Sequence, residues 1–420
     1  MSKKKILLLG DDLRATSGVG CQLRYLMTGL VQKGTWTVRQ FGAALRHGNY
    51  EPASVHPDII VKPIDGFGSP DLLRVTLAQE KPDAIVMMSD PRFYEWLFTG
   101  CEDVVHQVCP ILWWNIWDAR PTPVFNRPIY EATDTLNCIS DLTYEMLIEM
   151  FPADKFPGKV NYIPHGLPKE LFFPLSESAR KGYKLSVLGK ERENHFVCMW
   201  INRNAKRKRP NDVLESWKLF LDRLESECGH KNATLIMHTD PRDNEGPNLI
   251  YTAEALGISK DVVFSPDRLD FDKINILHNI SDCCLNISFA EGFGLGTLES
   301  MYAGNPIIAI KTGGMTRQVI NHNDGSENGI ALPVEIRSLV GSQGVPMIYE
   351  DLVSNKTTAD ALFRMSQMSE SDRRALGAKA REYALSEFNL DKIVDDWDAS
   401  LNYTIKTWKE RYKRWECKTI

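Results

Sequence analysis

The chain has 420 residues, 43% hydrophobic and 25% charged, so it is long enough for two domains and too apolar to belong to the disordered class. Its net charge of −5 excludes a general basic surface, so any attraction to nucleic acid or to an anionic membrane would have to come from a local patch. The nine cysteines are odd in number and form no CxxC pair, which favours reduced thiols over a disulfide framework or a zinc site.

The first predicted elements are a strand, a loop and a helix. The apolar run 5–9 ends at Gly10, small and charged residues fill 11–18, and apolar residues at helical spacing follow over 19–32. This order is typical of the start of a parallel α/β sheet. The first apolar run is too short for a signal peptide, and no stretch approaches the roughly 18 apolar residues of a membrane span. We therefore expect a soluble, cytoplasmic protein without integral membrane association.

Strands and helices continue to alternate through a first domain, which we place at 1–175. The strands lack the period-two pattern of a half-exposed sheet, as expected where helices cover both faces. They are predicted at 58–61, 84–88, 110–114, 135–139 and 160–163, with a helix at 142–150. The polar stretch 176–194 breaks this pattern and is predicted to be a linker.

A second alternating series forms a domain that we place at 195–390. Its strands are predicted at 195–201, 234–237, 262–264, 283–287 and 306–310, and helices follow from about residue 357. A last helix is expected at 391–420, where Trp408, Tyr412 and Trp415 repeat at helical spacing and favour packing back across the domains. Two such halves imply a cleft between them, where ligands of these folds bind.

The most informative stretch follows the strand that ends near Ile287. A loop with three glycines leads into a helix that is predicted to begin near Thr297. Glycines allow a ligand to approach the backbone closely, and a helix start offers free N–H groups to a phosphate or to sugar hydroxyls. Glu291 in the loop and Glu299 in the helix could hold the two ends of one sugar nucleotide. Taken without further context, a capping carboxylate beside a glycine-rich turn is the alternative.

The run Glu-Gly-Phe-Gly-Leu, followed by Leu-Glu-Ser-Met, Ala-Gly-Asn-Pro and Gly313-Gly314, resembles the signature of glycosyltransferase family four. The resemblance implies the α/β GT-B fold, with two Rossmann-like domains facing each other across a cleft and C-terminal helices. The first domain would be the acceptor side and the second would bind the donor. Glu291 would contact the donor sugar at the reacting centre, and Glu299 would bind the ribose. The residues whose backbone would lie along the sugar and diphosphate are Gly292, Phe293, Gly294 and Leu295.

Contacts to the diphosphate are expected from two further places. The family has an Arg followed five residues later by a Lys, and Arg203 and Lys208 fit this spacing. Fixed cations stabilise the charge that builds on a departing nucleotide, so no metal is required. Gly18 and Gly20 match the small residues that approach the diphosphate from the first domain. They do not form a dinucleotide fingerprint, because Leu23 stands where a third glycine is needed.

An aromatic loop and a junction histidine are further candidates. The family often has His-Asp where this chain has Trp117-Asp118, so Asp118 is a candidate catalytic carboxylate while the histidine is replaced. Trp117 could stack on a sugar or a base, or could be packing. His165 stands where the family has Asn at the domain junction; it could touch donor or acceptor, or could be a hydrogen-bonded hinge residue.

The resemblance implies a retaining glycosyltransferase that passes a sugar from a UDP-sugar or GDP-sugar to a hydroxyl of a glycan, small molecule or protein, without a prosthetic group. A phage-type DNA glycosyltransferase acting on a hydroxymethylated base is one alternative, favoured by the tryptophan-rich loop and the basic run 206–209 but not by the net charge. A non-catalytic sugar-nucleotide binding protein or an epimerase on the same fold is the other. The acceptor and the oligomeric state stay open at this point.

Overall fold

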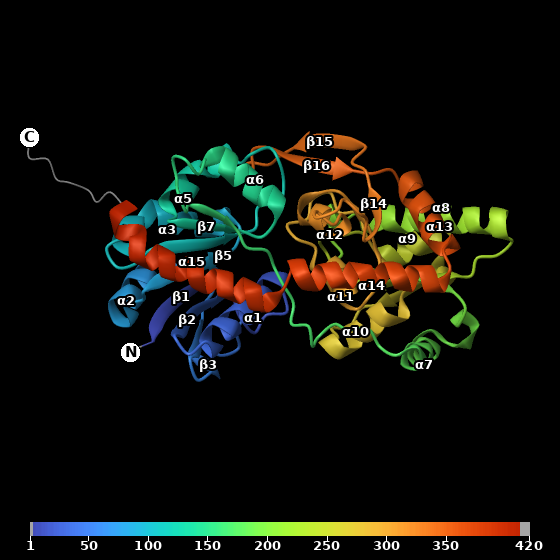
Figure 1. Cartoon of the computed structure of the whole chain (residues 1–420), viewed down its shortest axis with the longest axis horizontal. Helices are drawn as coiled ribbons and strands as arrows, with labels where there is room; N and C mark the ends of the chain where they lie inside the picture. Colours follow the sequence, from blue (N-terminus) through green and yellow to red (C-terminus); the bar gives the residue numbers. More distant parts are fainter. Residues whose placement is uncertain (1–2, 412–420) are drawn as a thin grey trace, which may run out of the picture. The chain divides into compact units, whose positions relative to one another are not determined.

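The computed structural model describes residues 3–411, which form two compact units (Figure 1). Unit 1 contains the described residues up to Gly166, the short segment Ser342–Pro346, and the described residues from Asn389 onward. Unit 2 contains Leu167–Gly341 and Met347–Phe388. No helix in the described part of the chain is long and apolar enough to cross a membrane.

Unit 1 is built on an eight-stranded sheet with the order β3-β4-β2-β1-β5-β6-β7-β8, in which only β3 runs antiparallel to its neighbour. Its strands are β1 Lys4–Asp11, β2 Trp36–Ala43, β3 Ala53–His56, β4 Ile59–Pro63, β5 Ala84–Met88, β6 Ile111–Asn115, β7 Thr135–Cys138 and β8 Val160–Tyr162. Its helices are α1 Gly18–Gln32, α2 Pro70–Glu80, α3 Glu95–Gly100, α4 Glu102–Val105, α5 Arg127–Ala132, α6 Asp141–Met150 and α15 Leu390–Arg411.

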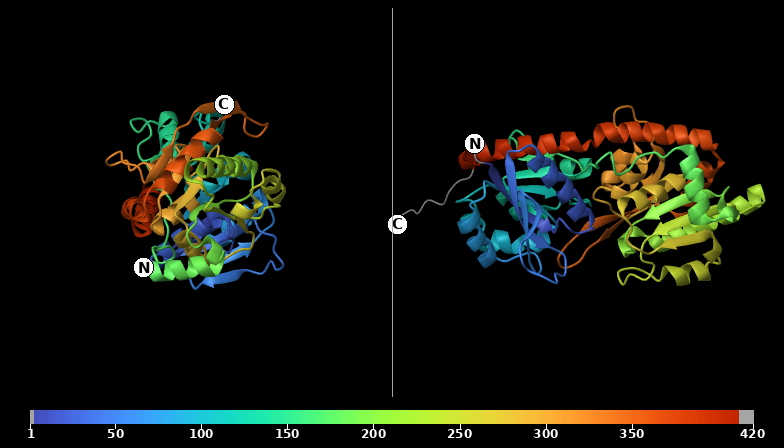
Figure 2. Two further views of the ribbon diagram at one scale, coloured as in Figure 1. Left: turned by 90° about the vertical axis from the view of Figure 1, so that its right-hand side faces the viewer. Right: turned by 90° about the horizontal axis from the view of Figure 1, so that it is seen from below.

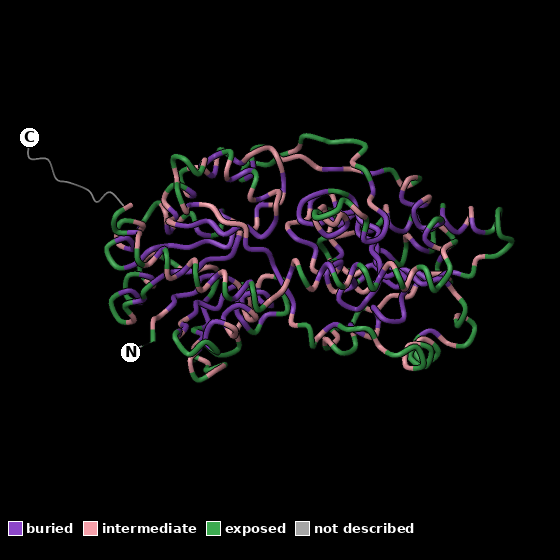
Figure 3. Tube along the Cα trace, viewed as in Figure 1, coloured by how far each residue is buried: buried purple, intermediate pink, exposed green. Residues whose placement is uncertain are grey.

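The local sequence explains how unit 1 begins. The continuous apolar run of β1 is buried because the sheet is covered on both faces (Figure 3). Helix α1 starts where it does because the Ser17 hydroxyl accepts a hydrogen bond from the Gly20 N–H and so caps the first turn. Leu23, Leu26 and Leu30 then repeat at helical spacing and are fully buried. The predicted strand, loop and helix are therefore confirmed.

Helix α15 returns to unit 1 and runs alongside it (Figure 2). Trp397 is fully buried, and its ring meets the ring of Trp114 edge to face with centroids 5.5 Å apart. The Trp36 indole N–H donates to Asp398 at 2.6 Å, and the hydroxyls of Thr135 and Thr404 hydrogen-bond at 2.8 Å. Of the predicted aromatic stripe, Trp408 is buried, whereas Tyr412 and Trp415 lie outside the described residues.

Unit 2 contains a six-stranded, fully parallel sheet with the order β11-β10-β9-β12-β13-β14 and a separate antiparallel pair, β15 and β16. Its strands are β9 Phe196–Ile201, β10 Ala233–His238, β11 Val262–Ser265, β12 Cys283–Asn286, β13 Ile307–Ile310, β14 Gly329–Leu332, β15 Ile336–Val340 and β16 Ile348–Leu352. Its helices are α7 Glu177–Leu188, α8 Pro210–Cys228, α9 Leu249–Ala255, α10 Phe271–Ile280, α11 Leu295–Tyr302, α12 Thr316–Val319, α13 Asn355–Gln367 and α14 Glu370–Glu387.

The stretch 176–194, for which the sequence predicts a linker, contains helix α7. The Ser176 hydroxyl caps this helix by accepting from the Ala179 N–H, and Gly189 ends it with a φ of 83°. Only Leu188 of the helix is buried, which is why no apolar stripe marks it in the sequence. The helices predicted from about residue 357 begin at Asn355.

Candidate active site

The glycine-rich loop lies between β12 and α11, where the carboxyl end of a central strand meets the start of a helix. Helix α11 begins at Leu295, two residues before its predicted start, and Gly294 precedes it with a φ of 91°. The loop backbone is fixed by buried side chains. Thr297 Oγ1 donates to the Gly294 carbonyl at 2.7 Å, and Gln318 Nε2 donates to the Phe293 carbonyl at 2.6 Å. These hydrogen bonds fix the conformation of the loop backbone.

Two further glycines, Gly313 and Gly314, pack directly against the backbone of the glycine-rich loop. Gly313 and Gly314 follow β13, and the Gly314 N–H donates to the Glu291 carbonyl at 3.0 Å. A Cβ atom on Gly313 would lie 1.9 Å from the same Glu291 oxygen, and the φ of Gly313 is 50°. No residue with a side chain fits there without moving the loop, so Gly313 sets the position of Glu291.

Glu291 pairs with Lys208. The Lys208 ammonium contacts Glu291 Oε2, and the two side chains are only 8% and 13% exposed. Lys208 ends a short 3-10 turn, Lys206–Lys208, and the Phe289 N–H donates to the Arg207 carbonyl at 3.0 Å, which ties the two loops together. Burial would raise the pKa of Glu291, but the charges of Lys208 and Arg207 outweigh it and hold that pKa below its usual value. Glu291 is therefore a carboxylate at neutral pH.

Arg203 is held by a carboxylate that the sequence analysis did not select. Its guanidinium donates to both oxygens of Asp243, at 2.7 and 3.1 Å, and the side chain is exposed. Asp243 raises the pKa of Arg203 through this hydrogen bond. Asp243 follows β10, some forty residues along the chain, and nothing in the local sequence indicates the pairing.

Glu299 lies on the first turns of α11 and meets a buried histidine. The Nε2 atom of His278 is 3.4 Å from Glu299 Oε2, and the His278 ring is fully buried. The Asn305 side-chain amide donates to the His278 carbonyl. His278 lies within α10 and was not a candidate from the sequence, because a lone histidine in a helix gives no signal.

The other residues of unit 2 that the resemblance assigns to the donor lie in the glycine loop and at the start of α11. Phe293 is buried, and its ring packs edge to face on Phe388 with centroids 5.3 Å apart. Gly292, Gly294 and Leu295 frame the end of the loop and the start of α11.

In unit 1 the predicted residues lie in three places. Gly18 and Gly20 form the first turn of α1, where Gly18 is exposed and Gly20 is buried. Trp117 is buried with its indole N–H donating to the Ala119 carbonyl at 2.7 Å, and Asp118 is half-buried beside it. His165 is buried with its ring 4.5 Å from that of Trp114.

The surroundings of His165 and Asp118 have different effects on nearby pKa values. Burial lowers the pKa of His165 to about 3, so its imidazole is neutral at physiological pH. The Asp90 carboxylate, through its hydrogen bond, and the charge of Asp118 raise the pKa of Arg92. In residues 3–411 no three His, Cys, Asp or Glu side chains are grouped so that they could hold a metal ion.

The sequence of this chain is similar to those of known glycosyltransferases. Residues 187–339 match the family model described as "Glycosyl transferases group 1". D-inositol 3-phosphate glycosyltransferase of Mycobacterium sp. (strain JLS) is 25% identical over 192 residues, 46% of this chain and 40% of that protein. The enzyme of that name from Mycobacterium marinum is 24% identical over 267 residues, 60% of this chain and 53% of that protein. The chain thus spans about half the length of the curated relatives it matches.

Solved structures match over nearly the whole chain. Sucrose-phosphate synthase from Thermosynechococcus elongatus has a TM-score of 0.72 at 16% identity, covering 97% of this chain and 99% of that one. Anabaena HepE in complex with UDP and glucose has a TM-score of 0.69 at 16% identity, covering 95% and 100%. The fold is therefore the predicted GT-B fold. The match to the glycosyl transferases group 1 model covers residues 187–339, which carry Lys208, Glu291 and Glu299, and it confirms the resemblance seen in the sequence.

Proposed function

We propose that this protein is a retaining glycosyltransferase that transfers a hexose from a UDP-sugar to a hydroxyl acceptor. The observation that carries the proposal is the buried ion pair of Lys208 and Glu291 beside a glycine loop locked by Thr297, Gln318 and Gly313. UDP as the donor nucleotide is supported by the similar structures that contain it, Anabaena HepE with UDP-glucose among them.

In this proposal Lys208 and Arg203 bind the donor diphosphate. The bond between the anomeric carbon and the phosphate oxygen breaks, and the cations stabilise the charge left on that oxygen. The acceptor oxygen forms the new bond to the anomeric carbon on the same face, and its proton passes to the leaving phosphate. Glu291, kept ionised by Lys208, binds sugar hydroxyls near the reacting centre and is not the nucleophile. Glu299, positioned by His278, binds the ribose hydroxyls.

A thermal-shift screen of nucleotide sugars identifies the donor, because a ligand stabilises the folded protein in proportion to its affinity and concentration. With that donor, Lys208→Gln is expected to lower kcat/KM by about 100-fold or more, as for loss of a fixed transition-state charge. Glu299→Ala is expected to weaken donor binding. Lys206→Gln is the matched control, since Lys206 is an exposed cation on the same turn. Wild-type turnover in Lys208→Gln, or the lack of any stabilising nucleotide sugar, contradicts the proposal.

Product stereochemistry tests the retaining course separately. Proton NMR of the product is expected to show the anomeric configuration of the donor. An inverted anomer would overturn the front-face mechanism while leaving glycosyl transfer intact.

A further inference from the structure

Unit 2 has a cavity of about 580 Å³ on a different set of elements from the glycine loop. Its walls come from α7, the ends of α8, α10 and α13, the first turn of α14, and residues beside the starts of β9 and β12. Five cations line it, Arg180, Lys181, Lys184, Arg373 and Arg374, together with four carboxylates, Glu177, Glu193, Asp282 and Glu370. None of them takes part in the site described above.

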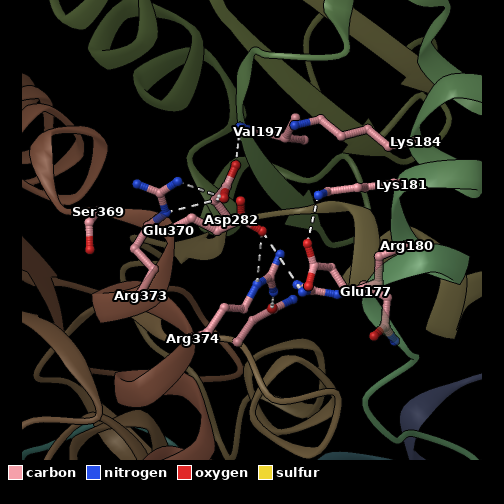
Figure 4. A network of polar contacts seen from close by, with 12 residues as sticks. Glu177, Arg180, Lys181, Lys184, Val197, Asp282, Ser369, Glu370, Arg373 and Arg374 are labelled. Atoms are coloured by element: carbon pink, nitrogen blue, oxygen red, sulfur yellow. Dashed lines mark hydrogen bonds and ion pairs between the residues drawn. The ribbon is translucent and has the colours of Figure 1, made fainter.

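Two of these cations already form an ion pair with a carboxylate. Lys181 Nζ lies 2.6 Å from Glu177 Oε1, one turn away on α7. Arg373 lies 3.0 Å from Asp282 Oδ1, and Asp282 also accepts the Val197 N–H at 2.8 Å. Figure 4 shows both pairs together with Arg180, Arg374 and Glu370.

Arg180 and Arg374 have no comparable partner. Both face the same atom, Glu370 Oε1, at 3.8 and 3.9 Å, which is beyond hydrogen-bond distance (Figure 4). Glu370 is mostly exposed, whereas the side chains of Arg180 and Arg374 are 15% and 26% exposed. Within residues 3–411 the Arg180 guanidinium makes no hydrogen bond, and the buried Nε of Arg374 has no acceptor. Desolvated guanidinium groups of this kind gain most from a strong acceptor.

Arg374 is nevertheless held in a fixed position. Its Nη1 donates to Asn305 Oδ1 at 2.7 Å, and Asn305 is fully buried. A second cavity of about 440 Å³ shares Arg180, Asn279 and Arg374 with the first and is lined beyond them by apolar groups such as Leu175 and Leu385. The two guanidinium groups therefore line both cavities. The second cavity is the less polar of the two and leaves room beside the guanidinium groups for an organic group.

We propose that this cavity is a second ligand site, which binds a phosphate or phosphomonoester group between Arg180 and Arg374. The guanidinium fork matches the geometry of phosphate oxygens, and such an anion would replace the distant carboxylate of Glu370 as their acceptor. The cavity volume is within the range of small-molecule sites.

The test is calorimetric titration of the full chain with inorganic phosphate, which needs no assumption about the donor or the reaction. Arg180→Gln is expected to weaken binding by about tenfold or more, as for loss of a charge-assisted hydrogen bond. Glu370→Gln is expected to tighten binding, because it removes the competing negative charge. Lys379→Gln is the control for loss of one positive charge: Lys379 lies on α14 with Glu370 and Arg374, is exposed and lines neither cavity.

Lys208→Gln separates this site from the proposed diphosphate site, since it should bind phosphate here as the wild type does. Binding that survives Arg180→Gln but is lost in Lys208→Gln would overturn the proposal. So would an equal loss in Lys379→Gln, which would indicate a general charge effect, or the absence of any phosphate binding to the wild type. Tighter binding of glycerol 3-phosphate than of inorganic phosphate would identify an ester as the ligand, and equal binding the free anion; both support the site.

Discussion

His106 is a buried base between two acids in unit 1. Its Nδ1 contacts Glu102, one turn earlier, and its Nε2 lies 2.8 Å from Asp134 Oδ2, which also accepts the Ile111 N–H. Burial would lower the pKa of His106, but the hydrogen bonds to Asp134 and Glu102 and their charges outweigh it and raise the pKa to about 9. The imidazole is therefore charged at neutral pH, unlike that of His165.

This raised pKa predicts a pH-dependent contribution to stability. Because the folded value lies above the unfolded value of about 6.5, the contribution is fully present below about pH 6.5 and is lost as the pH rises through 9. The contribution of His106 to the free energy of unfolding is about 3 kcal/mol. We expect urea denaturation to show a gap in the free energy of unfolding between wild type and His106→Gln that narrows by this amount between pH 6 and pH 10.

Comparing wild type with His106→Gln cancels the contributions of other groups that titrate in both proteins. Burial lowers the pKa of Lys159, which lies near Asp134, to about 8, so Lys159 titrates in the same range in both proteins. A gap that stays constant from pH 6 to pH 10 would mean that His106 is not charged in the folded protein.

At the candidate site, the residues that the sequence selects are those that belong to a local motif. Glu291 and Glu299 are marked by the glycines around them, and Lys208 by its spacing from Arg203. Asp243 and His278 could not be predicted, because they meet Arg203 and Glu299 only after β10 and α10 have folded against the sheet. Their residue types alone are compatible with many surface or core positions.

At the scale of elements, strands with continuous apolar runs were predictable, whereas a helix that buries almost none of its residues was not. Each predicted strand is present within two residues of its predicted ends, and most of these strands are buried on both faces, which leaves a continuous apolar run. Strands β2, β3, β14, β15 and β16 were not predicted. Polar residues such as Arg39 and Gln40 interrupt β2, and its pairing with β1 and β4 places it in the sheet. Helix α7 was missed because only one of its residues is buried.

Helix α15 is anchored by Trp397, which predicts how strongly the helix stabilises unit 1. Truncation of a fully buried tryptophan removes a large apolar contact and leaves a cavity, so Trp397→Ala is expected to cost about 3–5 kcal/mol in the free energy of unfolding. The Trp397 indole N–H has no partner among residues 3–411, so Trp397→Phe, which loses no hydrogen bond, is expected to cost less. Urea denaturation measures both.

The control for this prediction lies on the same helix. Lys392 is exposed, and Lys392→Ala is expected to change the free energy of unfolding by less than about 0.5 kcal/mol. Equal effects of Trp397→Ala and Lys392→Ala would mean that α15 does not stabilise unit 1 through this side chain.

At the scale of the whole molecule, the two units differ in how many separate segments of the chain form them. Unit 2 is nearly continuous in sequence, whereas unit 1 depends on α15, which arrives only after unit 2 is complete. Helix α15 covers Trp36 and Trp114, both of which are fully buried. A sequence pattern can locate α15 but cannot assign it to a unit, since that assignment rests on contacts across more than 250 positions, such as Thr135 with Thr404.

This difference predicts that the two units behave unequally as fragments. The fragment 167–388 retains the whole parallel sheet of unit 2 and is expected to unfold cooperatively by circular dichroism and to keep both the glycine loop and the cationic cavity. The fragment 1–166 leaves Trp36 and Trp114 without their cover and is expected to aggregate or to lack a cooperative transition. Joining 389–420 to 1–166 by a flexible linker is expected to restore that transition, because it returns Trp397 to Trp114. A cooperative, monomeric 1–166 would show that α15 is dispensable for the fold of unit 1.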